Sequence, residues 1–176
     1  MELRNKVFLG ALSSVLVGGA MLWEGVRYKP YVDIAGVLTV CHGYTGGDIT
    51  QRTYTAEECR TLLEKELYTH SKKILECINV PLTQNEFDAY SLFAYNVGVK
   101  GFCSSSALRL LNQDKRKEAC NAIAYTPNGN PNWSYVNGKF VQGLHNRRKY
   151  ERNRCLATCI QTTASRLHRS HTSVIK

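Results

Sequence analysis

Three side chains near the start of the chain could together hydrolyse a glycosidic bond: Glu24, Asp33 and Thr39. This reaction needs a protonated carboxyl group that donates to the leaving oxygen and a second, ionised carboxylate that stabilises or supplies the attacking group. Glu24 directly follows a run of uncharged residues, and partial desolvation at the end of an apolar helix favours the protonated form of a carboxyl group. We therefore expect Glu24 to be the acid.

Asp33 suits the second role, on a strand or turn across a cleft from Glu24. Thr39 carries a hydroxyl group that can orient a water molecule beside Asp33. A β-hairpin that bends at Ala35-Gly36 would bring these two residues together. Each of the three also has an ordinary structural interpretation, as a charge beside an apolar segment, a turn residue and a strand residue. The indication that these three residues act together therefore comes from the sequence around them.

The segment that precedes Glu24 is compatible with a membrane. Residues 7–23 carry no charge and follow Arg4 and Lys6, and about 17–25 residues suffice to span a bilayer. The interpretations are a cleaved signal peptide, a permanent anchor, a signal-anchor that inserts and later escapes, and the buried first helix of a soluble domain. We favour the escaping signal-anchor, because glycine, serine and alanine weaken the segment and cleavage after Ala20 would leave Glu24 on a loose terminus. Every interpretation except the buried helix exports the protein.

The net charge and the spacing of the cysteines limit the classes of partner and metal site that the protein could have. The 176 residues suit one domain, and a formal net charge of +9 favours nucleic acid, acidic lipid or an anionic cell envelope. No helix-turn-helix, zinc-finger or RNA-binding signature is present, so nucleic acid is not an expected partner. The seven cysteines form no C-x-x-C pair and no Cys/His cluster at zinc spacing. We expect no structural metal site, and disulfides in an oxidising compartment, with at least one thiol unpaired in a monomer.

Cys155 and Cys159 are not expected to pair with each other. Residues four apart on a helix have Cβ atoms about 5–6 Å apart, whereas a disulfide needs about 3.5–4.5 Å.

The patterning predicts an α+β fold, a mostly helical domain with one small antiparallel β element that lines the active-site cleft. Two capping boxes, Thr55 with Glu58 and Thr83 with Glu86, open helices that should end near Ile78 and at Gly98. The other predicted elements are a small sheet over 28–54 with turns at 35–36 and 46–47, helices over 106–113, 115–125 and 142–160, and a loop over 126–139. The expected organisation is a signal-anchor over 1–23, a catalytic domain over 24–160 and a basic flexible tail over 161–176.

Around the acidic residues the sequence resembles the active-site signature of the phage-type lysozymes, the muramidases of glycoside hydrolase family 24. The matching residues are Glu24-Gly25, Tyr31-x-Asp33 and Gly36-Val37-x-Thr39-Val40-Cys41-His42-Gly43-x-Thr45-Gly46. The central and last helices of the family match Phe93, Tyr95-Asn96-Val97-Gly98, Gly138-Lys139, Gly143-Leu144, Asn146-Arg147-Arg148 and Glu151. The resemblance covers about residues 24–156. With the weak N-terminal segment, the chain is most similar to the signal-arrest-release endolysins of phages that infect Gram-negative bacteria.

The resemblance implies that Glu24 is the general acid and that Asp33 positions or activates the attacking water, with Thr39 assisting. The bond cleaved would be the β-1,4 bond between N-acetylmuramic acid and N-acetylglucosamine, with inversion and without a cofactor. The expected partners are peptidoglycan glycan strands and, before release, the host inner membrane through residues 7–23. The protein, a monomer, would move from that membrane to the periplasm. Arg147 matches a position near the acid, where it would ion-pair with or orient Glu24; a solvent-facing helix arginine is the alternative.

Two other functions fit parts of the pattern. A lytic transglycosylase needs one catalytic glutamate and yields an anhydro sugar, and Asp33 and Thr39 argue against it. A non-catalytic peptidoglycan-binding protein would not depend on Asp33. His42 and Tyr44 could line the substrate site, although packing is the expected role of Tyr44. A tethered segment would keep the cleft unassembled, and a disulfide at Cys41 could hold the cleft closed or open.

Overall fold

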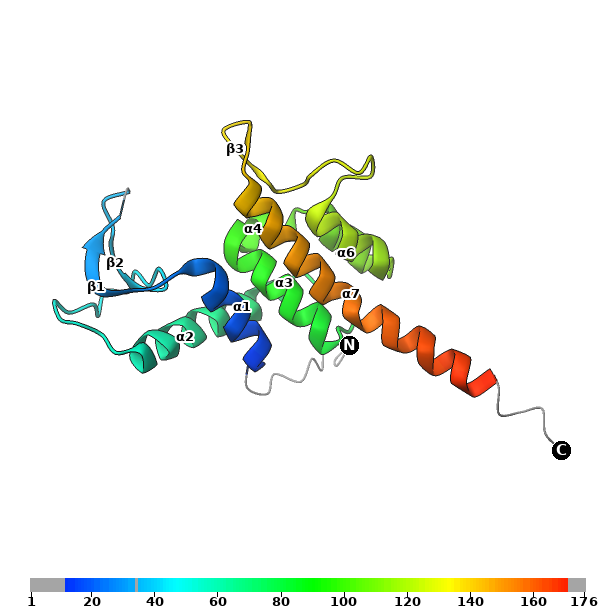
Figure 1. Ribbon diagram of the computed structural model, residues 1–176, viewed down its shortest axis with the longest axis horizontal. Helices are drawn as coiled ribbons and strands as arrows, with labels where there is room; N and C mark the ends of the chain where they lie inside the picture. Colours follow the sequence, from blue (N-terminus) through cyan, green and yellow to red (C-terminus); the bar gives the residue numbers. More distant parts are fainter. Residues whose placement is uncertain (1–11, 34, 171–176) are drawn as a thin grey trace.

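The computed structural model describes residues 12–33 and 35–170 of the chain (Figure 1). Its elements are, in order, α1 (Ser14–Glu24), β1 (Arg27–Val32), β2 (Leu38–Cys41), α2 (Ala56–Ile74), α3 (Gln84–Val97), α4 (Val99–Cys103), α5 (Ser106–Asn112), α6 (Arg116–Ala124), β3 (Tyr135–Val136), β4 (Lys139–Phe140) and α7 (Gln142–Ser170). The described part is mostly helical, and β1 and β2 form a small antiparallel sheet beside the helices. The predicted α+β fold is confirmed.

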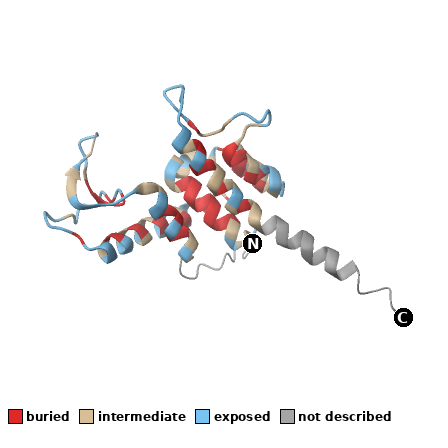
Figure 2. Cartoon of the chain, in the orientation of Figure 1, coloured by how far each residue is buried: buried red, intermediate tan, exposed pale blue. Residues whose placement is uncertain are grey.

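Helix α3 lies at the centre and is mostly buried (Figure 2). It begins as predicted, because Thr83 and Glu86 satisfy each other's backbone N–H groups in a capping box. One set of its side chains, which includes Tyr90 and Phe93, belongs to a large apolar core shared with α4, α5, α6 and α7. Another set, Phe87 and Leu92, packs in a second core with α1 and α2. The two cores therefore meet at α3.

Helix α1 is the described part of the predicted membrane segment, and it packs against the domain. Leu16, Val17 and Ala20 are buried in the second core. Gly19 allows this close approach, because a Cβ atom there would lie 3.0 Å from Leu92 Cδ1, whereas a Cβ at Gly18 would meet nothing within 4 Å. None of the helices over the described residues is long and apolar enough to cross a bilayer. The first part of the predicted segment, up to residue 11, lies outside the described residues.

The β1–β2 hairpin is tied to helix α2. Thr39 of β2 faces Tyr31 of β1 across the antiparallel pair, and the bend at Ala35-Gly36 falls where the sequence predicts it. A disulfide joins Cys41, at the end of β2, to Cys59 of α2, with a Cα–Cα distance of 4.9 Å. These sulfurs and the buried side chains around them form a third apolar cluster.

The expectation of disulfides is confirmed. Besides the bond between Cys41 and Cys59, the described residues contain Cys77–Cys103 and Cys120–Cys155. Cys155 therefore pairs with a cysteine of α6 and not with its helical neighbour Cys159, as the spacing predicts.

The elements differ from the sequence prediction in several places. Helix α4 was not predicted, and the strands of the sheet predicted over 28–54 end at Cys41. Helix α2 ends at Ile74, before the predicted end near residue 78. The predicted loop over 126–139 contains part of a short hairpin, β3–β4, which turns at Asn137 and Gly138, both with positive φ. An Asn-Gly pair is a strong hairpin signal, and the prediction overlooked it. Helix α7 continues to Ser170, past the predicted end at residue 160, and residues 171–176 lie outside the described residues.

Candidate active site

Glu24 is the last residue of α1, and its side chain is 24% exposed. The helix stops there because Gly25 takes a positive φ of 65°, which a glycine adopts without steric cost. Oε1 of Glu24 is buried and lies 2.7 Å from Nη1 of Arg147, a close ion pair without hydrogen-bond alignment. The other oxygen, Oε2, makes no hydrogen bond to a described residue and is accessible to solvent. Oε2 is therefore the oxygen that can reach a substrate.

Arg147 comes from α7, and its predicted ion pair with Glu24 is confirmed. The alternative, a solvent-facing arginine, is wrong, because only 4% of Arg147 is exposed. Its Nε also lies 3.2 Å from Oε1 of Glu151, which accepts a hydrogen bond from Nη2 of Arg148 at 2.7 Å. Arg148 and Glu151 are fully buried. Burial raises the pKa of Glu151 to about 7, against the pull of both arginines.

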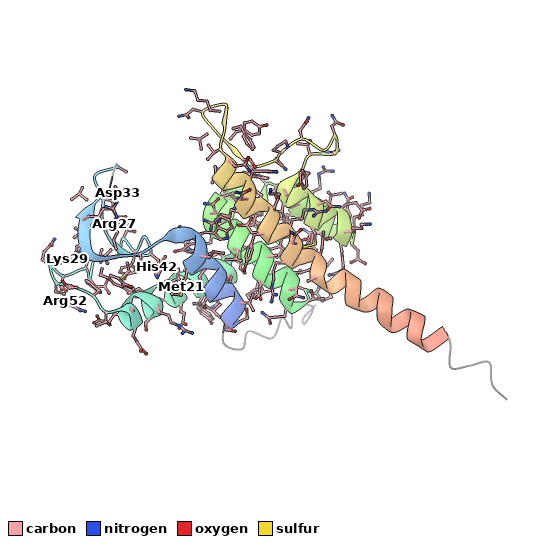
Figure 3. The ribbon with its side chains drawn as sticks, in the orientation of Figure 1. Met21, Arg27, Lys29, Asp33, His42 and Arg52 are labelled. Atoms are coloured by element: carbon pink, nitrogen blue, oxygen red, sulfur yellow. A yellow bond between two sulfur atoms is a disulfide. The ribbon has the colours of Figure 1, made fainter. Side chains whose placement is uncertain are left out.

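Asp33 lies at the tip of the β1–β2 hairpin, where Figure 3 labels it. Its Oδ1 accepts hydrogen bonds from the backbone N–H groups of Ala35 and Val37, at 2.8 and 2.9 Å. The two bonds close the bend and fix the carboxylate. Oδ2 makes no hydrogen bond within the described part of the chain, so it is the oxygen able to accept a proton from a water.

Thr39 is nearly buried, with 3% exposed, and its hydroxyl donates to the carbonyl of Val37 at 3.0 Å. Because its hydrogen is committed, this hydroxyl can only accept from a water. Val37 thus links the two residues of the hairpin, because its N–H group donates to Asp33 and its carbonyl accepts from Thr39. No hydrogen bond or ion pair joins Glu24 to either residue in the described chain, and α1 ends near the base of the hairpin (Figure 1).

His42 has a structural role that the sequence did not indicate. Its side chain is buried, and Nδ1 contacts the carbonyl oxygen of Gly25, the residue after Glu24. A carbonyl can only accept, so Nδ1 carries the hydrogen and donates it. Figure 3 shows His42 close to the end of α1. The end of β2 therefore holds the peptide that follows Glu24.

Two tyrosines nearby are kept neutral. Tyr44 is buried and donates to Oδ1 of Asp48 at 2.6 Å, and this bond raises the pKa of Tyr44 to about 12. Tyr44 also belongs to the third apolar cluster, so it packs there as expected. Burial, and then the negative charges of Glu24 and Glu66, raise the pKa of Tyr95 to about 12. Tyr95 thus adds no charge to the surroundings of Glu24.

Comparisons with known proteins agree with this geometry. Residues 21–151 match the model of the phage lysozyme family. A SAR-endolysin of bacteriophage PS119 is 43% identical over 164 residues, which cover 88% of this chain and 94% of that protein. A SAR-endolysin of bacteriophage PS34 is 43% identical over 150 residues, which cover 83% and 86%.

Solved structures share the fold over most of their length. A crystal structure of P22 lysozyme superposes with a TM-score of 0.73 at 31% identity, covering 85% of this chain and all of the other. The muramidase domain of SpmX from Asticaccaulis excentricus superposes with a TM-score of 0.72 at 28% identity, covering 83% and 97%.

Proposed function

The chain belongs to the phage lysozyme family, and we propose that Glu24, Asp33 and Thr39 carry out its reaction with inversion. The protein is a glycoside hydrolase, a muramidase of the endolysin type. Its substrate class is peptidoglycan, and the bond cleaved is the β-1,4 bond between N-acetylmuramic acid and N-acetylglucosamine. The observation that carries the assignment of the acid is the geometry of Glu24, with one oxygen held by Arg147 and the other open.

In the proposed mechanism, Oε2 of Glu24 donates a proton to the leaving glycosidic oxygen. Oδ2 of Asp33 takes a proton from a water that attacks the opposite face of the sugar. The Thr39 hydroxyl accepts a hydrogen bond from that water. Inversion needs room for the water, with the carboxyl groups about 6.5–9.5 Å apart. The support for a water-based mechanism is that no hydrogen bond or ion pair joins Glu24 to the hairpin within the described residues and that Asp33 is braced by two backbone N–H groups.

The products of purified peptidoglycan test the residue assignments. Wild type should yield reducing muramic acid ends by mass spectrometry, and Glu24→Gln and Asp33→Asn should each lower their formation by at least 10²-fold. Proton NMR of the first turnover should show the α anomer. Anhydro ends would establish a transglycosylase and remove Asp33 from its role. Full activity of Glu24→Gln would leave the acid unassigned, and intact strands would favour a binding protein.

We further propose that residues 7–23 tether the protein to the host inner membrane and that release into the periplasm activates it as a monomer. The SAR-endolysin names of its relatives support this. So does α1, whose apolar side chains fill a core of the domain once the segment is out of lipid. Docking then sets Glu24 against Arg147.

Gly18 offers a direct test, because it is exposed and a side chain there meets nothing. Gly18→Leu should bind the bilayer more strongly while leaving the docked helix intact. We expect delayed lysis of cells that express the full chain, with normal activity of the purified protein. Gly18→Gln is the matched control, since it also adds a helix-forming side chain but no apolar surface. Lysis at the wild-type time by Gly18→Leu would contradict the tether.

A further inference from the structure

Two carboxylates, Glu24 and Glu151, share one buried guanidinium group, that of Arg147. Nη1 of Arg147 lies 2.7 Å from Oε1 of Glu24, and Nε lies 3.2 Å from Oε1 of Glu151. The three side chains come from two elements, because Glu24 ends α1 while Arg147 and Glu151 lie one helical turn apart on α7. The acid of the proposed mechanism is therefore linked to a carboxylate that no substrate can reach.

The charges around Glu24 balance only when Glu151 is counted. Arg147 and Arg148 are both buried, so solvent screens them poorly. Arg148 stacks over the ring of Phe93 at 5.0 Å and pairs with Glu151. From α3, Tyr95 faces Glu24 as a neutral group, and from α2, Glu66 acts on the same tyrosine. Without Glu151, two buried cations would face Glu24.

A general acid must hold its proton at the working pH, whereas a neighbouring arginine favours the ionised carboxylate. Arg147 alone would thus oppose the role proposed for Glu24. We propose that Glu151 is a positioning residue, which draws Arg147 and Arg148 toward itself and so weakens their hold on ionised Glu24. The inference rests on the proposed role of Glu24 as the general acid.

Two variants with opposite changes of charge test the proposal. Glu151→Gln keeps the shape but leaves both cations to Glu24, so the basic limb of the pH dependence of kcat/KM should move down by about one pH unit. Arg148→Gln removes a cation, so the limb should move up. Both variants lose a buried ion pair, so a purely structural role would lower activity at every pH. An unmoved limb, or equal shifts in both variants, would overturn the proposal.

A titration of the wild-type protein covers the case in which these variants fail to fold. With ¹³C-labelled glutamate, the Cδ resonance of Glu24 should show a second inflection at the pH where Glu151 titrates, because coupled groups share macroscopic steps. Burial brings the pKa of Glu151 to about 7, inside the range of the experiment. A single step for Glu24 would overturn the inference.

The two experiments separate this inference from the proposed function. If Glu24→Gln abolishes cleavage while the wild-type titration lacks the second inflection, Glu24 remains the acid and only the role of Glu151 falls. If Glu24→Gln still cleaves, the proposed function falls, whatever the titration shows.

Discussion

Glu24 is held from two directions. Arg147 holds one oxygen of its side chain, and His42 holds the carbonyl of Gly25, the next residue along the chain. The first contact comes from α7 and the second from the end of β2. The first contact holds the carboxylate of Glu24, and the second holds the backbone directly after it. Orientation of this kind contributes strongly to catalysis.

Replacement of His42 should therefore lower activity without a change in the products. In His42→Phe the exposed Gly25 carbonyl loses its donor but can be solvated, so the variant should lose about 0.5–1.5 kcal/mol of stability and lower kcat by about 10- to 100-fold. His42→Asn is the matched control, because its amide nitrogen can occupy the position of Nδ1. Thermal unfolding and turnover of peptidoglycan measure the two effects. Equal activity of His42→Phe and wild type would show that the contact is dispensable.

At this scale the sequence was informative where residues are joined by local backbone geometry. Asp33 and Thr39 are six positions apart, and the bend between them could be predicted from Ala35-Gly36. The role of His42 could not, because its partner lies on another element and a histidine in a turn region gives no sign of its direction. The pairing of Arg147 with Glu24 came from the resemblance, since a separation of more than a hundred residues leaves no local pattern.

At the scale of the elements, the β1–β2 hairpin is joined to α2 by a covalent link. Cys41 takes a positive φ of 60°, which is unfavourable for a residue with a side chain. Its bond to Cys59 holds the end of β2 against α2, close to His42 and two residues from Thr39. The hairpin therefore relies on this disulfide for its placement.

The double variant Cys41→Ala/Cys59→Ala should lose about 3 kcal/mol of stability and several-fold in kcat. Cys77→Ala/Cys103→Ala is a matched control, because its loop of 26 residues is comparable with the loop of 18 residues, and it lies outside the hairpin. It should lose similar stability but keep its kcat below the unfolding temperature. Denaturant unfolding and turnover rates give both quantities. Equal losses of kcat would refute a specific role for the hairpin disulfide.

The two adjacent glycines of α1 should respond differently to the same added methyl group. Gly18→Ala should stabilise the purified protein by about 0.5–1 kcal/mol, because alanine favours the helix and the site is open. Gly19→Ala gains the same propensity but presses on Leu92 and Tyr150, so it should be less stable than Gly18→Ala. Chemical denaturation compares the two. A more stable Gly19→Ala would mean that α1 does not dock as described.

Element starts were predictable and element ends were less so. The capping boxes at Thr55 and Thr83 involve residues three apart, so a short window of sequence contains the whole signal. The end of α2 has no glycine to mark it: Leu75 keeps helical angles at the cap, and the chain turns where it packs. The short β3–β4 hairpin was missed although Asn137-Gly138 signals it, because prolines and glycines nearby favoured a loop.

The whole molecule carries a formal net charge of +9, which should assist its approach to an anionic envelope. Lysis of cell walls should therefore decline as the salt concentration rises from 0.05 to 0.5 M, over roughly the range in which the Debye length falls below 10 Å. Cleavage of short soluble glycan fragments without peptide stems is the control, and it should change little. If both reactions declined equally, salt would be acting on the catalytic site and not on the approach.

The position of α3 between the two apolar cores also determines how the protein opens in solution. Because Phe93 belongs to one core and Leu92 to the other, loss of α1 alone would uncover only one side of this helix. Amide hydrogens in the middle of α3 should then exchange with deuterium only through global unfolding, at the rate set by the full stability of the protein. Amides of the exposed strand β1 should exchange much earlier, through local opening. The slowest-exchanging amides would thus lie in α3, the helix that becomes exposed only when the whole molecule unfolds as one cooperative unit.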